Sequence, residues 1–135
     1  MHLKHKISAR DLTVAVLMMD GDQFIRWIQS ERTGVTNMAY RLGECMTESD
    51  LSLVQSAESK MREQQAKVQQ RVNSHTTDAA ISNLLKVSMI KQFFTEAIAF
   101  YRAYQEACRG SSVAKTALHF GVDEDALDHA INTRY

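Results

Sequence analysis

The chain is 135 residues long, carries no net charge and contains no proline. Hydrophobic residues make up 44% of it and glycine occurs only five times, a composition that allows long helices and disfavours a turn-rich β fold. Because Lys plus Arg and Asp plus Glu both total 16, a generally basic nucleic-acid-binding surface is excluded, and any such surface has to be local. The length fits one domain, and we predict a single all-α domain over residues 1–135.

The N-terminal segment and the two cysteines bear on where the protein resides. Residues 1–7 are predicted to form a flexible tail, and the apolar run from Val14 to Met19 is too short to span a membrane. Cys45 and Cys108 lie far apart in the chain and match no metal-binding or redox spacing. These features predict a reduced, cytoplasmic protein that makes no membrane contact.

The first helical region is predicted to begin after Ser8, a residue type that caps helix N-termini. The polar triplet from Asp20 to Asp22 interrupts it, which indicates either a kink or a short break between two helices. Apolar residues recur on both sides of this interruption, at Leu12, Val16, Met19, Phe24, Trp27 and Ile28. They form the candidate core face of this region.

Two further helices are predicted before the middle of the chain. Thr36 or Asn37 is expected to cap a short helix that ends at Gly43. Thr47, with Asp50 three residues later, predicts the start of a long helix. The apolar stripe of that long helix is thin and consists of Leu51, Val54, Met61, Val68 and Val72. We therefore expect this helix to project from the body or to pair with a copy of itself.

The central helix is predicted to run from Thr77 to Cys108, after a short polar break that folds it back on the preceding helix as an antiparallel hairpin. Two neighbouring apolar seams cover more than half of its circumference. The first seam comprises Val87, Ile90, Phe94, Ala97, Tyr101, Tyr104 and Cys108, and the second comprises Ile81, Leu85, Met89, Phe93 and Phe100. Such a helix has to be covered by the rest of the chain or by a second copy, so Ile90, Phe94 and Tyr101 are candidate core or dimer residues.

The last segment, residues 111–135, has the spacing of a helix-turn-helix around Gly121. Four acidic residues occupy the start of its second helix: Asp123, Glu124, Asp125 and Asp128. DNA would repel these acids, so packing on the body or on a partner is favoured over base reading by this helix. A fainter copy of the pattern, around Gly43, indicates either an internal repeat or a chance helical corner.

A modest basic stripe is predicted on the long helix before the central one. Lys60, Lys67 and Arg71 share one face at spacings of seven and four. The alternatives are an ordinary solvated helix face and a nucleic-acid or partner contact.

The sequence shows no nucleophile with its base, no phosphate loop and no metal-ligand set, so we predict neither enzyme activity nor a cofactor or metal.

Several short blocks between residues 11 and 105 resemble the FlhD family, the small helical subunits of the flagellar master transcription activator. Asp11-Leu12 is similar to the opening of the family's first helix, and Ala39 to Gly43 (AYRLG, preceded by Met38) is similar to its Met-aromatic-Arg-Leu-Gly block. Arg71 to His75 (RVNSH) resembles a further block that ends in Ser-His. The resemblance implies an all-α homodimer that joins a larger, FlhC-like, zinc-containing partner and helps it bind promoter DNA. Arg41 and His75 fall within the matching blocks and are implied as contact residues.

The combined prediction is a cytoplasmic, dimeric, all-α protein with a long central helix packed in a hairpin and shorter flanking helices. Its expected function is that of a transcription-regulating subunit that acts with a partner in a DNA-binding complex. Contacts to duplex DNA or the partner are assigned to Arg41, Lys60, Lys67, Arg71 and His75. The alternative is a helical adaptor, chaperone or anti-regulator that binds another protein without touching nucleic acid.

Overall fold

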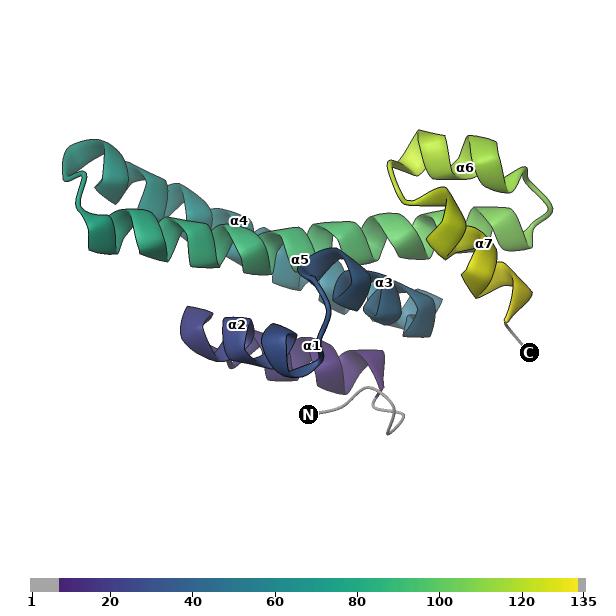
Figure 1. Ribbon diagram of the computed structural model, residues 1–135, viewed down its shortest axis with the longest axis horizontal. Coiled ribbons are helices and arrows are strands. Elements are labelled where there is room, and N and C mark those ends of the chain that lie inside the picture. Colours follow the sequence, from purple (N-terminus) through teal and green to yellow (C-terminus); the bar gives the residue numbers. More distant parts are fainter. Residues whose placement is uncertain (1–7, 134–135) are drawn as a thin grey trace.

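The computed structural model describes residues 8–133, which form seven α-helices arranged around one long helix (Figure 1). In chain order the helices are α1 (Ala9–Leu17), α2 (Gly21–Ser30), α3 (Val35–Cys45), α4 (Glu48–Ser74), α5 (Asp78–Cys108), α6 (Val113–Phe120) and α7 (Glu124–Asn132). The predicted all-α class is confirmed. The predicted flexible tail at residues 1–7 lies outside the described residues. Over residues 8–133, no helix combines the length and the apolar character needed to cross a membrane.

The central helix, α5, forms an antiparallel hairpin with α4 and is the axis of the molecule (Figure 1). Thr77 caps its N-terminus, since the Thr77 hydroxyl accepts a hydrogen bond from the Ala80 N–H at 3.1 Å. Across the hairpin, the Gln65 amide donates to the Ser88 hydroxyl at 3.0 Å, which satisfies a polar residue in the seam of α4. Both the predicted central helix and the predicted hairpin are therefore confirmed. The helix α4 packs along α5 and does not project alone.

The N-terminal region consists of two helices with a break between them. Asp20 accepts a hydrogen bond from the Gln23 N–H at 2.8 Å, and the Gln23 side chain accepts from the Asp20 N–H at 2.9 Å. This reciprocal cap starts α2 anew, so the break is favoured over the kink. An ion pair of 2.7 Å between Lys86 and Asp22 then ties the start of α2 to α5.

Two predicted features of α3 are wrong. The N-cap is Gly34 rather than Thr36 or Asn37, and the helix continues through Gly43 to Cys45. A Cβ atom on Gly43 would lie 2.6 Å from the Ala97 carbonyl oxygen, a backbone atom of α5. Gly43 therefore allows two helix backbones to touch instead of ending a helix, and the second helix-glycine-helix corner predicted around it does not exist.

Two hydrophobic clusters line α5. The first lies under α1 to α4, where Phe93 makes edge contacts with Phe24, Trp27 and Phe94 at ring-centroid distances of 5.2–5.9 Å. Ile90, Phe94 and Tyr101 are 4%, 0% and 6% exposed in this cluster. Their burial is completed within one chain, so they belong to the core and need no second copy to cover them.

The second cluster joins α3 and the end of α5 to the C-terminal corner formed by α6 and α7. Tyr40 stacks on Phe100 at a centroid distance of 4.4 Å, and its hydroxyl accepts a hydrogen bond from the Asp123 N–H at 3.0 Å. Gly121 turns the chain between α6 and α7 with a φ of 70°, a left-handed conformation that favours glycine. Within the described residues, α6 and α7 thus form a helical corner around Gly121, and this corner packs on α5.

Candidate nucleic-acid interface

Charge is strongly segregated along the neutral chain. Residues 59–92, the outer part of the α4–α5 hairpin, contain six cationic residues and two acids. The cations are Lys60, Arg62, Lys67, Arg71, Lys86 and Lys91, and the acids are Glu63 and Asp78. The remainder of residues 8–133 contains seven cations and fourteen acids. The positive potential that nucleic acid needs is therefore concentrated at one end of the molecule. A count of charged residues by segment would reveal this concentration of positive charge from the sequence alone.

The three lysine and arginine residues of the predicted basic stripe share one flank of α4. Because successive residues of a helix are turned by about 100°, Lys60, Lys67 and Arg71 lie within roughly 40° of one another. All three are exposed. The stripe predicted from the spacing is therefore present as a geometric feature, although its members have different surroundings.

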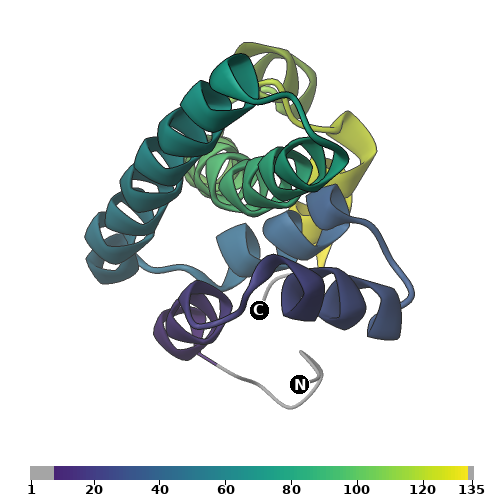
Figure 2. The same cartoon turned by 90° about the vertical axis from the view of Figure 1, so that its left-hand side faces the viewer.

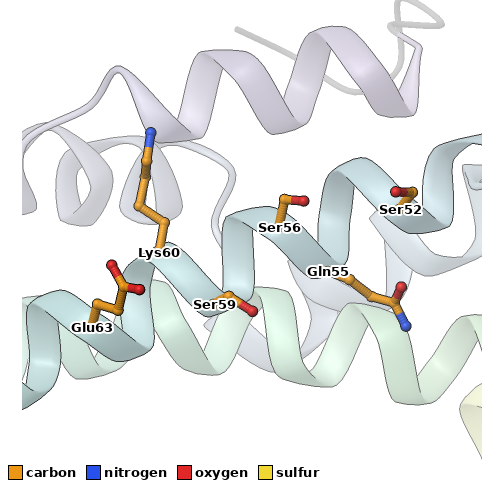
Figure 3. Close-up of a pocket in the computed structure, with 6 residues that line it drawn as sticks. All are labelled: Ser52, Gln55, Ser56, Ser59, Lys60 and Glu63. Atoms are coloured by element: carbon orange, nitrogen blue, oxygen red, sulfur yellow. The ribbon is translucent and has the colours of Figure 1, made fainter.

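Lys60 lies apart from the other two, nearer the N-terminal helices. It borders a cleft of about 250 Å³ between the α1–α2 turn and the hairpin, together with Asp20 and Lys86. Figure 3 shows its side chain extending from α4 toward the faint ribbon of the N-terminal helices, beside a polar strip that includes Ser56 and Glu63. An acid thus lies on each side of Lys60, so it is a weaker candidate for a phosphate contact.

Lys67 and Arg71 line a shallow hollow at the C-terminal end of α4 together with His75. The hollow has a volume of about 330 Å³ and is completed by Gln70 and Ser74. His75 is the residue after α4, and its backbone N–H donates to the Arg71 carbonyl oxygen at 2.7 Å, which fixes it beside the helix end. No acidic residue lines the hollow, and within residues 8–133 neither cation forms an ion pair. Three of the five predicted contact residues are therefore gathered in one place.

Arg41 does not belong to this group. It projects from α3, which packs against the middle of α5, whereas the end of α4 lies at the far left of Figure 1. The Arg41 guanidinium is 3.8 Å from the Glu31 carboxylate, whose side chain is only 6% exposed, and it donates to the Met38 sulfur at 3.5 Å. Its geometry supports a structural role, because it helps to neutralise a buried acid.

The acidic start of α7 lies at the opposite end of α5 from the hollow (Figure 1). Asp123 caps α7 by accepting a hydrogen bond from the Ala126 N–H at 2.8 Å, which gives that carboxylate a structural role. Glu124, Asp125 and Asp128 are exposed. The two ends of the long axis therefore differ in the sign of their charge (Figure 2 views the molecule from the basic end).

The described residues show little that points to catalysis. In the part of the chain that the structure covers, no three His, Cys, Asp or Glu side chains are grouped so as to hold a metal ion. Burial raises the pKa values of Tyr40, Tyr101 and Cys45, which keeps these groups protonated.

Comparisons with known proteins add no further constraint. A scan against models of protein families and searches of curated proteins and of solved structures found no match to this chain. The relationship to the FlhD family stays a prediction from the sequence. The functional argument therefore rests on the geometry and charge of the hairpin end.

Proposed function

We propose that this chain is a cytoplasmic, non-enzymatic subunit of a transcription-regulating complex, and that it contacts duplex DNA through the hollow at the end of α4. The observation that carries the proposal is the grouping of Lys67, Arg71 and His75 around a surface without acidic residues. The unpaired state of Cys45 and Cys108 supports the cytoplasmic assignment.

The charge distribution determines how DNA is expected to approach. Each lysine or arginine that neutralises a phosphate releases counterions and stabilises the complex. The acid-rich remainder of the chain repels the phosphate backbone, so only the outer part of the hairpin is suited to contact. Two strong cations give weak binding on their own, and we therefore propose that affinity and site choice come from a partner. The FlhD resemblance implies a zinc-containing, FlhC-like subunit in that position, and a homodimer of this chain.

The direct test is a salt series of binding to promoter-length duplex DNA by the chain with its co-purified partner. Removing both cations with Lys67→Ala and Arg71→Ala should weaken binding equally for all sequences and lower the salt slope by about two. The matched control is Arg102→Ala with Lys115→Ala, which removes the same charge from the acidic end and should leave the slope unchanged. The proposal is wrong if the control pair weakens binding as much as the test pair, or if the test pair binds like the parent.

Two further variants complete the test. Asp125→Ala with Asp128→Ala should change DNA binding little, and abolition of binding by this pair would instead make α7 the DNA-reading element. Arg41→Ala should alter assembly with the partner more than contact with DNA, so complex formation is measured first by size exclusion. If the parent complex shows no salt-dependent binding, the alternative of a helical adaptor replaces the DNA proposal. The exposed apolar side chains of Ile81 and Leu85 favour that alternative.

A further inference from the structure

The cleft of about 250 Å³ between the α1–α2 turn and the hairpin combines an apolar floor with a polar rim. The floor consists of Val16, Leu17, Met19, Met61, Val87 and Ile90. The rim consists of Asp20, Lys60, Gln64, Asn83 and Lys86. We infer that this cleft binds a free α-amino acid with an apolar side chain, such as leucine. The inference goes beyond the proposed DNA contact and does not depend on it.

Contacts between elements far apart in the sequence hold the walls of the cleft. Lys86 of α5 forms an ion pair of 2.7 Å with Asp22 at the start of α2. A Cβ atom on Gly21 would lie 2.6 Å from the Lys86 Cβ atom, so the stem of Lys86 rests directly on the backbone of α2. Met61 and Ile90 of the floor are only 5% and 4% exposed and belong to the first hydrophobic cluster. The cleft is therefore a hollow over the core whose sides are fixed.

The charges at the rim are balanced, and one of each sign has no ion-pair partner. Lys86 is paired with Asp22, whereas within residues 8–133 neither Lys60 nor Asp20 forms an ion pair. The Oδ1 atom of Asp20 accepts the capping hydrogen bond from the Gln23 N–H at 2.8 Å, which leaves the second carboxylate oxygen available. Figure 3 shows the Lys60 side chain extending toward the N-terminal helices, and Asp20 lies in the turn between those helices. The rim thus offers one ammonium and one carboxylate.

A zwitterion is the class of ligand that fits this balance. A free amino acid brings a carboxylate for the Lys60 ammonium and an ammonium for the Asp20 carboxylate, so both charges gain a partner. The side-chain amides of Gln64 and Asn83 form no hydrogen bond within the described part of the chain and can donate to the ligand's carboxylate. A dianion would be repelled by Asp20, and an uncharged apolar molecule would cover both charges without pairing them.

The volume of the cleft limits the size of the amino acid. A water molecule occupies about 30 Å³ in the liquid, so the cleft accommodates about eight groups of that size. Leucine, isoleucine and methionine are of this size, whereas tryptophan is larger and glycine has no side chain to cover the floor. Met19 and Met61 are unbranched and adaptable, so the floor can fit either a branched or a linear side chain.

Calorimetric titration of the full-length chain with leucine tests the cleft directly. We expect saturable binding with a dissociation constant of roughly 0.1–1 mM, as for other ligands of this size. Isocaproate lacks the ammonium group of leucine and isopentylamine lacks its carboxylate, so each should bind roughly threefold to tenfold more weakly. The absence of saturable leucine binding would overturn the inference. Equal binding of isocaproate or isopentylamine would overturn the zwitterion as the ligand class.

Two substitutions remove the charges at the rim and keep the local structure. Lys60→Met keeps an unbranched stem, and Asp20→Asn keeps a residue type that caps a helix as well as aspartate does. Each should weaken leucine binding roughly threefold to tenfold. The matched controls are Lys115→Met and Asp123→Asn, the second of which also changes a helix N-cap, and both should bind leucine like the parent. Equal effects of the rim variants and the controls would contradict the assignment.

The methionine methyl groups report where leucine binds in the unsubstituted chain. Met19 and Met61 line the cleft, whereas Met38 and Met46 are buried elsewhere in the first hydrophobic cluster. In nuclear magnetic resonance spectra of the methyl-labelled chain, leucine should shift the signals of Met19 and Met61 and leave those of Met38 and Met46 in place. Shifts confined to Met38 and Met46, or no shift at saturating leucine, would overturn the cleft as the site.

The outcome is separable from that of the proposed DNA contact. No residue that lines the cleft also lines the hollow of Lys67, Arg71 and His75. The Lys67→Ala and Arg71→Ala pair should therefore lose DNA binding and keep leucine binding. A parent that binds leucine but no DNA would support the cleft and remove the function. A parent that binds DNA but no leucine would support the function and overturn the cleft.

Discussion

The core half of α5, Ile90–Cys108, is enclosed by neighbouring helices, whereas its tip half, Asp78–Met89, lies mainly against α4. Phe94 and Ala97 in the core half have no exposed surface, but Leu85 in the tip half is 61% exposed. Both halves have apolar residues at the same three- and four-residue spacings. A single periodic pattern therefore describes two environments, one that is buried and holds the fold together and one that is exposed. The difference can be measured by substituting matched residues in each half.

The largest contrast is expected between Phe94→Asp and Leu85→Asp. Phe94→Asp places a carboxylate without a partner in the core, at an expected cost of about 4 kcal/mol or more in the free energy of unfolding. This is a large fraction of the free energy of unfolding of a typical domain, which is about 5–15 kcal/mol. Leu85→Asp should change the free energy of unfolding by less than about 0.5 kcal/mol under conditions where the chain is monomeric. Urea denaturation followed by circular dichroism measures both, and equal costs would remove the distinction between the two halves.

The next contrast concerns the close approach of α3 to the core half. Gly43→Ala should destabilise the protein by about 1–3 kcal/mol, because its Cβ would lie 2.6 Å from the Ala97 carbonyl oxygen and 3.0 Å from the Tyr101 nitrogen. Alanine raises intrinsic helix propensity, so a gain in stability would show that the helices separate without cost. The control is Gly34→Ala, where a Cβ meets nothing within 4 Å and the cost should stay below roughly 1 kcal/mol.

The smallest of the three effects is expected at the second cluster. Tyr40→Phe removes the hydrogen bond from the Asp123 N–H and should cost about 1 kcal/mol at neutral pH. Burial raises the pKa of Tyr40 above its usual value of 10.0. Because the pKa of Tyr40 is higher in the folded state than in the unfolded state, the stability that this group contributes is fully present below the unfolded-state pKa. That contribution is lost as the pH rises from the unfolded-state pKa through the folded-state pKa. The parent should therefore weaken above about pH 10, and Tyr40→Phe should weaken less over that range. Denaturation midpoints on either side of that pH give the comparison, and an unchanged pH dependence would contradict it.

Much of the fold follows from local signals that the sequence displays. Ser8, the Thr47–Asp50 pair and Thr77 mark helix starts that the structure confirms, because a cap is formed by residues within one turn of each other. Gly121 likewise ends α6 in a left-handed turn. Gly43 was misassigned because glycine also permits close approach, and that use depends on α5, more than fifty residues away. Local sequence does not distinguish a glycine that ends a helix from a glycine that allows two helices to pack closely.

The candidate site was predictable in part. The stripe of Lys60, Lys67 and Arg71 follows from helical spacing alone, whereas the position of Arg41 beside a buried carboxylate depends on how α3 lies against the end of α2. The exposure of Ile81 and Leu85 was not predictable, because their spacing is the same as that of residues in the core. How far the covering helices extend along α5 determines which of these positions remain exposed to solvent. That reach is a property of the tertiary structure.

Because α5 is one unbroken helix, it restricts where residues can be inserted into this protein. Phe94 and Ala97 face the first cluster and Ala103 and Ala107 face the second, so the two clusters are held at a fixed phase along one helix. One residue inserted between them would turn the second face, together with the α6–α7 corner that packs on it, by about 100° away from Tyr40 of α3, while seven residues would nearly restore the phase. At the hairpin end, between Thr77 and Ile81, the same insertion would turn Asp78 and Ala79, which are exposed, and Ala80, which is half-buried. We therefore expect insertions to be tolerated at the basic tip of the hairpin, where they would change the length of the hairpin and leave the core intact.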